Sequence, residues 1–214
     1  MNRLQLARAL RQYAGIAAGS TGNAPSSTLN QTGEYKRVVD WVDEAWAQLQ
    51  REHKWNFQWE NATVTVLAAN SSVVGTIPSH RYVQDSAYIG SKRLLYLPWE
   101  SFRRRYPAAL ISSGEPSAWS IRPDKAFVVD HAPTADTAIS VERYKNPIAM
   151  AADTDEPEMP SEHHMAIVYK ALLLYANFEE AGITRATAEA ELNRHLMALG
   201  LLEMPDFELG EPLC

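Results

Sequence analysis

Cysteine is nearly absent from this chain: its 214 residues include one, Cys214, at the C-terminal end. A disulfide framework and a cysteine-based zinc site are therefore excluded within one copy. No apolar run reaches the length of a membrane span. The segment 1–19 has no signal-peptide core either, because Arg8 and Arg11 interrupt its apolar stretch. We expect a soluble protein of a reducing compartment.

Acidic residues are missing from the start of the chain, where none precedes Glu34. Together with the amphipathic pattern of residues 1–19, this composition is similar to that of an organellar transit peptide. The first helix of a helical bundle explains the same pattern, and we favour that interpretation.

An excess of positive charge is also lacking, since 20 Lys and Arg face 26 Asp and Glu, and the net charge is −6. General nucleic-acid binders present a net positive surface to phosphates, so this balance argues against one. An acidic chain can still surround DNA, where like charge discourages sticking. The apolar fraction of 46% supports a substantial core, and the length suits one compact domain, alone or with a smaller insert.

Apolar residues recur at helical spacing near both ends of the chain. Four helices are expected, over about 1–19, 34–54, 161–182 and 184–200. Side chains that cap helices stand at three of the expected starts, and glycines stand at two of the expected ends. These residues are Thr32, Ser161 and Thr184 at the starts, and Gly182 and Gly200 at the ends.

Between the helices the pattern changes from helical to alternating. Short β-branched or apolar runs separated by turn residues predict strands. These runs lie at about 63–67, 81–89, 94–97, 118–121, 126–129 and 138–144. Pro98 opens a brief helical segment, 99–106, and Pro107 closes it. Such short strands indicate a small antiparallel sheet or sandwich.

The predicted fold class is α+β: an antiparallel α-helical bundle with an inserted small antiparallel β-domain and an extended C-terminal tail. The expected parts are bundle helices over 1–57, the β-domain over 58–148, further bundle helices over 149–200 and the tail over 201–214. An acidic, proline-bounded link, 153–160, is expected to be solvated.

Catalytic and metal-binding patterns fail at particular residues. The stretch 19–22 lacks the lysine of a phosphate loop, and no serine stands in G-x-S-x-G. His163 and His164 are adjacent, so on a helix they point about 100° apart, and we expect both to be solvated. A calcium loop opening at Asp153 would need Gly and Glu where Glu158 and His164 stand. We expect no enzyme, no cofactor and no metal; a weak surface cation site on the acidic link is the alternative.

The most distinctive local feature is the segment 93–107, RLLYLPWESFRRRYP. Aromatic residues at spacings of three and four predict the buried face of a short helix, with the arginines on its wet side. Contact of the arginines with phosphates or bases is the alternative, which the overall acidity disfavours. The residues of this motif are Tyr96, Trp99, Phe102, Tyr106, Arg103, Arg104, Arg105 and, further along the chain, Trp119.

The order of several short motifs resembles that of the adaptor, or head-completion, proteins of tailed phages. A Trp-rich helix precedes a β-region, and a histidine-containing helix start follows it. The motifs are LPWESFRRRYP at 97–107, GEPSAW at 114–119, VDHAPTAD at 129–136, VERY at 141–144 and a proline-led helix start at 160–172. The likeness extends from Trp41 to Leu199, over most of the chain.

This resemblance implies a non-enzymatic subunit of the phage neck: a dodecameric ring below the portal that joins the DNA-filled head to the tail and lets DNA pass. The implied partners are the portal protein, tail proteins of the nozzle or stopper kind, other copies of the chain and, in transit, double-stranded DNA. No membrane is implied. The implied location is the neck of the virion, after assembly in the host cytoplasm.

The end of the chain carries the expected portal contacts. Apolar residues lie there on a segment that cannot continue as a helix past Pro205, and such segments gain order when a partner supplies a groove. The expected portal-binding residues are Leu201, Leu202, Met204, Phe207 and Leu209. A disordered terminus, or one folded back on its own bundle, is the alternative.

Two other functions fit the sequence less well. A tail-associated module that binds a protein or a glycan through the β-domain would expose Trp99 or Trp119. A cell-wall hydrolase would need a pair of carboxylates, whose spacing is spatial and leaves no trace in the sequence.

Overall fold

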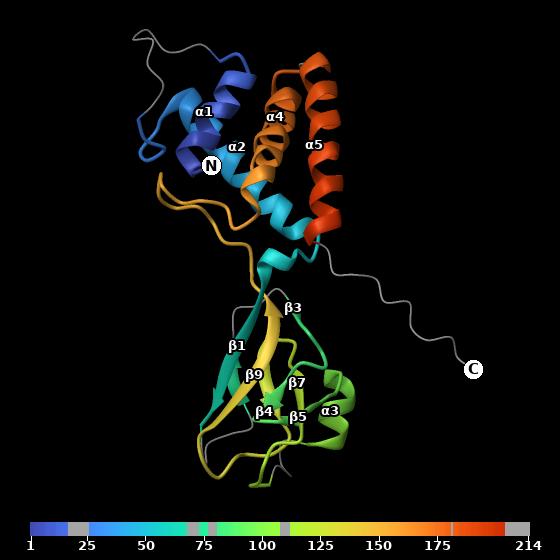
Figure 1. Ribbon diagram of the computed structural model, residues 1–214. Coiled ribbons are helices and arrows are strands. Elements are labelled where there is room, and N and C mark those ends of the chain that lie inside the picture. The colour runs from blue at the N-terminus through green and yellow to red at the C-terminus, as the bar shows by residue number, and fades with distance from the viewer. Residues whose placement is uncertain (17–25, 68–72, 77–80, 108–111, 181, 204–214) are drawn as a thin grey trace, which may run out of the picture. The chain divides into compact units, whose positions relative to one another are not determined.

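The computed structural model describes the chain apart from residues 17–25, 68–72, 77–80, 108–111, 181 and 204–214 (Figure 1). The chain divides into two compact units. One, the helical unit, comprises Met1–Gln58 and Pro147–Cys214, and the other, the β unit, comprises Trp59–Asn146. Five α-helices and two sheets lie in the described residues, which confirms the mixed α+β class.

Helices α1 (Arg3–Tyr13) and α2 (Gly33–Glu52) begin in different ways. Asn2 caps α1 through a reciprocal pair of hydrogen bonds with Gln5, each 2.9 Å long. Thr32 occupies the N-cap position of α2 as predicted, but its side chain makes no capping hydrogen bond. An extended backbone at Thr32 is therefore enough to start α2 here.

The C-terminal helices differ from the prediction at all four of their ends. Ser161 opens a 3-10 turn, η3 (Ser161–His163), and α4 (Met165–Phe178) follows it, so the predicted cap at Ser161 is wrong. Glu180 takes the left-handed backbone after α4 at φ 56°, a position usually held by glycine. Gly182 instead begins α5 (Gly182–Glu203). The predicted cap at Thr184 and the predicted end at Gly200 both lie inside α5, because packing outweighs a glycine's cost of about 1 kcal/mol.

The helical unit has one core. Helix α4 contacts α1, α2 and α5, and α1 also contacts α2. This central position explains why α4 is apolar around most of its circumference. The largest fully buried side chains of this core are Trp46, Trp55, Leu6, Leu10, Leu49, Ile167 and Leu199.

The first sheet of the β unit is built on a long antiparallel pair. Strand β1 (Trp59–Val66) pairs with β9 (Thr137–Tyr144) over its full length, from Trp59 opposite Tyr144 to Val66 opposite Thr137. Three two-residue strands complete this sheet: β3 (Arg81–Tyr82), β4 (Tyr88–Ile89) and β5 (Lys92–Arg93).

The second sheet has the order β2-β8-β7-β6, with β2 (Val73–Thr76), β8 (Ala126–Val129), β7 (Ala118–Ile121) and β6 (Leu95–Tyr96). Strands β7 and β8 have the predicted bounds, whereas β2 was not predicted. The pair β6–β7 is parallel, which corrects the purely antiparallel expectation. A parallel pair needs a crossover connection, and that connection contains α3 (Trp99–Arg105).

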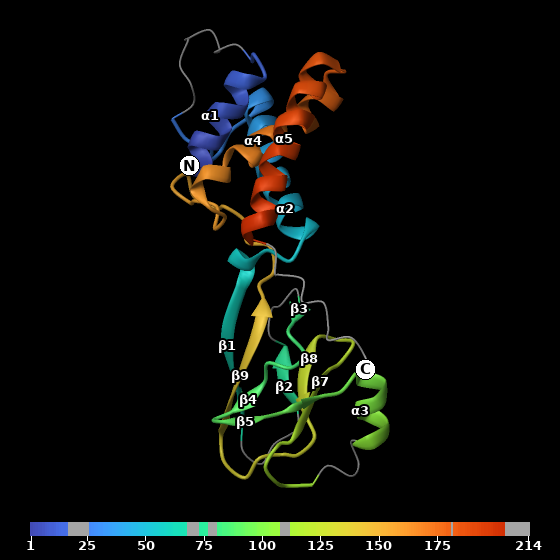
Figure 2. The same cartoon turned by 45° about the vertical axis from the view of Figure 1, so that its right-hand side comes forward.

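Strands β7 and β8 are buried on both faces. Trp119, Phe127 and Val129 join a cluster with residues of β1 and β9 from the first sheet. Ala118 and Val128 point the other way and pack with Phe102 of α3. The β unit is thus layered as sheet, sheet and helix, and Figure 2 shows α3 beside β7.

Candidate assembly surfaces

Helix α3 seats its aromatic residues on the second sheet. Phe102 is buried, with ring centroids 6.1 Å from Trp99 and 5.2 Å from Tyr106, both half-buried. Tyr96 does not share this face, which corrects the prediction. It lies on β6 because Pro98 sets an extended backbone before the helix, and its ring is 5.0 Å from that of Trp119.

The three arginines of α3 are all exposed, as predicted for its wet side. Arg103 pairs with Glu100 at 2.7 Å, and Nε of Arg104 donates to the Glu100 carbonyl at 3.1 Å. The guanidinium of Arg105 lies 5.6 Å from the centre of the Tyr106 ring. One acidic residue faces three cations here, so α3 presents a positive surface on an acidic protein.

A buried carboxylate, Asp130, holds the GEPSAW segment in place. It accepts hydrogen bonds from the main-chain nitrogen of Ser117 at 2.8 Å and from its hydroxyl at 2.5 Å. Nδ1 of His131 lies 3.0 Å from the same carboxylate. Burial acts to raise the pKa of Asp130, but the hydrogen bonds from Ser117 and Ala118 and the nearby His131 outweigh it and lower the pKa. Asp130 therefore stabilises the approach to β7.

The end of α5 exposes apolar side chains. Leu201 is 89% exposed and Leu202 58%, and Met197, one turn earlier, is 74% exposed. The other three predicted portal-binding residues, Met204, Phe207 and Leu209, lie outside the described residues. The face of α5 away from the core is thus apolar at its C-terminal end.

The adjacent histidines are buried, so the expectation that both are solvated is wrong. His163 is 7% exposed and His164 2%. The turn of η3 directs both rings inward: Nε2 of His164 lies 3.0 Å from the carbonyl of Met159, and its Nδ1 contacts the main-chain nitrogen of Met1. Burial is the main cause that lowers the pKa of His164, and the neutral form is favoured.

The acidic link is packed rather than solvated along much of its length. Asp153 accepts a hydrogen bond of 2.6 Å from the main chain of Thr28. Arg3 donates to Asp43 through Nε at 3.0 Å and Nη2 at 2.6 Å, and to the carbonyl of Ala151 through Nη1 at 2.9 Å. Main-chain bonds from α1 to Asp153 and Asp155 add to these contacts. The link therefore holds α1 and Thr28 together, while Arg3 joins α1 to α2 through Asp43.

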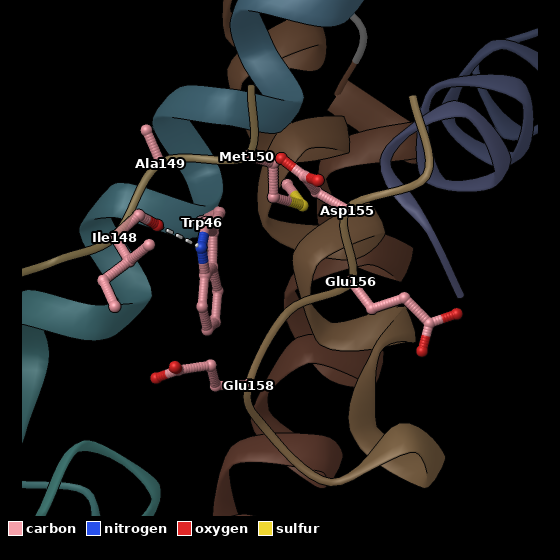
Figure 3. Close-up of a pocket in the computed structure, with 7 residues that line it drawn as sticks. All are labelled: Trp46, Ile148, Ala149, Met150, Asp155, Glu156 and Glu158. Carbon is pink, nitrogen blue, oxygen red and sulfur yellow. Dashed lines mark hydrogen bonds between the residues drawn. The ribbon is translucent and has the colours of Figure 1, made fainter. Parts of the chain in front are cut away.

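A hollow of about 190 Å³ lies beside this link (Figure 3). Its lining residues are Trp46, Ile148, Ala149, Met150, Asp155, Glu156 and Glu158. Trp46 donates to the Ile148 carbonyl at 2.8 Å, Asp155 accepts two main-chain bonds, and Glu156 points away from the indole. The polar groups thus serve the fold, and no three His, Cys, Asp or Glu side chains converge on a metal position anywhere in the described residues.

The comparison with known families shows which family this chain belongs to. The family model described as SU10 adaptor protein matches residues 1–206. The chain belongs to the SU10 adaptor protein family. A search of the curated proteins found no match.

Membership in the SU10 adaptor family confirms the predicted resemblance to phage head–tail adaptors. The family implies a structural, non-enzymatic role in a phage virion, with portal and tail components as partners. Among the described helices, none is both long and apolar enough to cross a membrane.

One alternative function loses its main support in this SU10 adaptor. A binding module in the tail was expected to expose Trp99 or Trp119. Trp119 is fully buried, and its ring stacks on Phe127 at 4.9 Å. Trp99 is half-buried against Phe102, and Trp119 is therefore closed to a glycan whereas Trp99 is partly covered.

Proposed function

We propose that this SU10 adaptor forms a ring below the portal, which connects the DNA-filled head to the tail and lets DNA pass. The observation that carries the proposal is the family match across residues 1–206. A dodecamer suits the proposal because a ring of this kind repeats the symmetry of the portal. The antiparallel arrangement of the bundle helices and the extended C-terminal tail are part of the same proposal.

A closed ring needs two different surfaces on each subunit, because its side-to-side contacts are heterologous. Helix α3, with its three exposed arginines, is a candidate for one of these side-to-side surfaces. The net charge of −6 favours free passage of DNA wherever acidic groups face the lumen.

The portal contact is assigned to the end of α5 and the segment after it. Leu201 and Leu202 are exposed on a regular helix, so they can enter an apolar groove without local unfolding. Met204, Phe207 and Leu209 would extend this contact beyond the helix. Neck components would bind the other face of the ring, and the DNA contact would be transient.

The test is assembly with purified portal protein, followed by size-exclusion chromatography with light scattering and by electron microscopy. We expect a closed ring on the portal from the wild-type chain. The double variant L201E/L202E should stay unbound, because two charges in an apolar groove have no partner. L67E is the matched control, since Leu67 is a 59% exposed leucine of the β unit and should assemble normally.

Two results would contradict the proposal. A chain that never forms a ring under any portal condition would refute the neck assignment itself. Normal assembly of L201E/L202E would refute the assignment of the portal contact to α5 and leave the ring intact.

A further inference from the structure

Two histidines from distant parts of the helical unit meet at one position. Nδ1 of His163, at the end of η3, lies 3.5 Å from Nδ1 of His195 on α5. Their rings are nearly perpendicular, at 84°, and the His195 ring also stacks on Tyr169. Neither residue belongs to the surfaces assigned above. We propose that His163 and His195 form a two-histidine site for a divalent transition-metal ion.

The hydrogen-bond pattern leaves this pair incompletely satisfied. Nη2 of Arg194, which can only donate, lies 3.4 Å from Nε2 of His195, so the His195 hydrogen belongs on Nδ1. That hydrogen is donated to Nδ1 of His163, whose own hydrogen is then on Nε2. Nε2 of His163 is buried and has no hydrogen-bond partner among the described residues.

The separation of the two Nδ1 atoms matches that of two nitrogen ligands on one metal ion. Ligand nitrogens at about 2.0–2.1 Å from a tetrahedral zinc ion lie roughly 3.4 Å apart, and the observed separation is 3.5 Å. Water completes the coordination.

Binding requires one proton to move. Nδ1 of His195 releases its proton to solvent and Nε2 takes one up, so the ring stays neutral. Arg194 must then turn away from Nε2, and its side chain is 66% exposed and pairs with Glu191. Oε1 of Glu162 lies 3.7 Å from Nε2 of His163 and is 68% exposed, so a small rotation lets it accept the Nε2 hydrogen. A carboxylate in this position is the usual outer partner of a metal-bound histidine.

The ion would join η3 to α5 and so hold the start of α4 against the last helix. Imidazole nitrogens select ions such as Zn²⁺, Ni²⁺ and Cu²⁺, whereas Mg²⁺ and Ca²⁺ prefer oxygen ligands. Since the metal binds the folded chain, it should raise the melting temperature as its concentration rises.

The test is calorimetric titration of the full-length chain, freed of any affinity tag, with Zn²⁺ and separately with Mg²⁺. We expect saturable binding of one Zn²⁺ per chain and none of Mg²⁺. H195Q should lose this binding, and E162Q should weaken it by about 10-fold or more. H53Q is the matched control, because His53 is exposed and lies elsewhere in the helical unit, and it should bind as the wild type does.

A spectroscopic measurement on the wild-type chain keeps the test independent of variant folding. The ¹⁵N signals of the His163 and His195 imidazoles should both shift at Nδ1 when Zn²⁺ is added. Absence of saturable Zn²⁺ binding, unchanged Nδ1 signals, or wild-type affinity in folded H195Q would each overturn the proposal. Ring assembly on the portal does not enter these measurements, so their failure leaves the proposed function untouched.

Discussion

The helical unit and the β unit of this protein bury their apolar side chains in different ways. In the helical unit, four helices share one apolar cluster, and α4 contacts the other three. In the β unit, strands β7 and β8 separate two clusters, one shared with the first sheet and one shared with α3. Each face of these two strands therefore depends on a different neighbour.

The two units also differ in the polar contacts that join distant segments of the chain. In the helical unit, charged and indole side chains join segments that are distant in the sequence, as in Arg3–Asp43 and Trp46–Ile148. In the β unit, backbone ladders join distant segments, the pair Arg143–Glu60 supports one of these ladders, and the buried Asp130 supports a local turn. We infer that the helical unit depends more on individual polar side chains, whereas the β unit depends more on its large buried aromatics.

The largest expected effect is the loss of Trp119 from the β unit. Replacing this fully buried indole by alanine should lower the free energy of unfolding of the β unit by about 3–5 kcal/mol. Hydrogen exchange resolved by residue would report the two units separately. W59A is the matched control, since Trp59 is 44% exposed, and it should cost less than about 1 kcal/mol. Equal losses in both variants would mean that the two clusters are not the main support of the β unit.

A smaller effect is expected from the polar contact of the helical unit. R3M keeps most of the side chain's volume but removes three hydrogen bonds, to Asp43 and to the Ala151 carbonyl, and should cost about 2 kcal/mol in chemical denaturation. K36M removes an exposed ion pair with Asp40 on the same unit and should cost roughly 0.5 kcal/mol or less. If R3M and K36M lower the free energy of unfolding by the same amount, the helical unit does not depend on individual buried polar contacts.

The smallest effect concerns Asp130 and depends on pH. Its pKa is lower in the folded chain than in the unfolded chain, so the unfolded chain binds more protons in acid. The stabilisation is therefore complete above the ordinary aspartate pKa of about 3.9 and is lost as pH falls through the lower folded value. D130N should be less stable than wild type by about 1 kcal/mol near neutral pH.

The difference between D130N and wild type should shrink as the solution is acidified in denaturation series at several pH values. D85N serves as the control, because Asp85 is an exposed carboxylate of the same unit. A difference that stays constant with pH would show that Asp130 acts through its shape rather than its charge.

Local signals in the sequence were sufficient for several elements. The bounds of β7 and β8 agree with their apolar runs, and α3 begins after Pro98 and ends before Pro107. Helix ends near Gly182 and Gly200 were not predictable in this way. A glycine ends a helix only when the surrounding packing allows the helix to end there. In this chain Glu180, not Gly182, adopts the left-handed backbone after α4.

Some features of the candidate surfaces were likewise predictable from the local sequence, and others were not. The exposed arginines of α3 follow from a local pattern, since aromatic residues at spacings of three and four turn the remaining positions outward. The burial of His163 and His164 does not, because it results from η3 and from contacts with residues far away in the sequence. The packing of Tyr96 on Trp119 follows from the parallel pairing of β6 with β7, which no local pattern reveals.

By itself, the sequence determined the α+β class, the aromatic–arginine motif and the resemblance that the family match confirmed, because each of these depends on residues close together in the chain. Only the tertiary structure decided that β7 and β8 are covered on both faces, that Trp119 is closed to ligands and that His163 meets His195. These features arise where segments distant in the sequence exclude water from one another, and hydrophobic periodicity records which residues are buried but not which partners bury them.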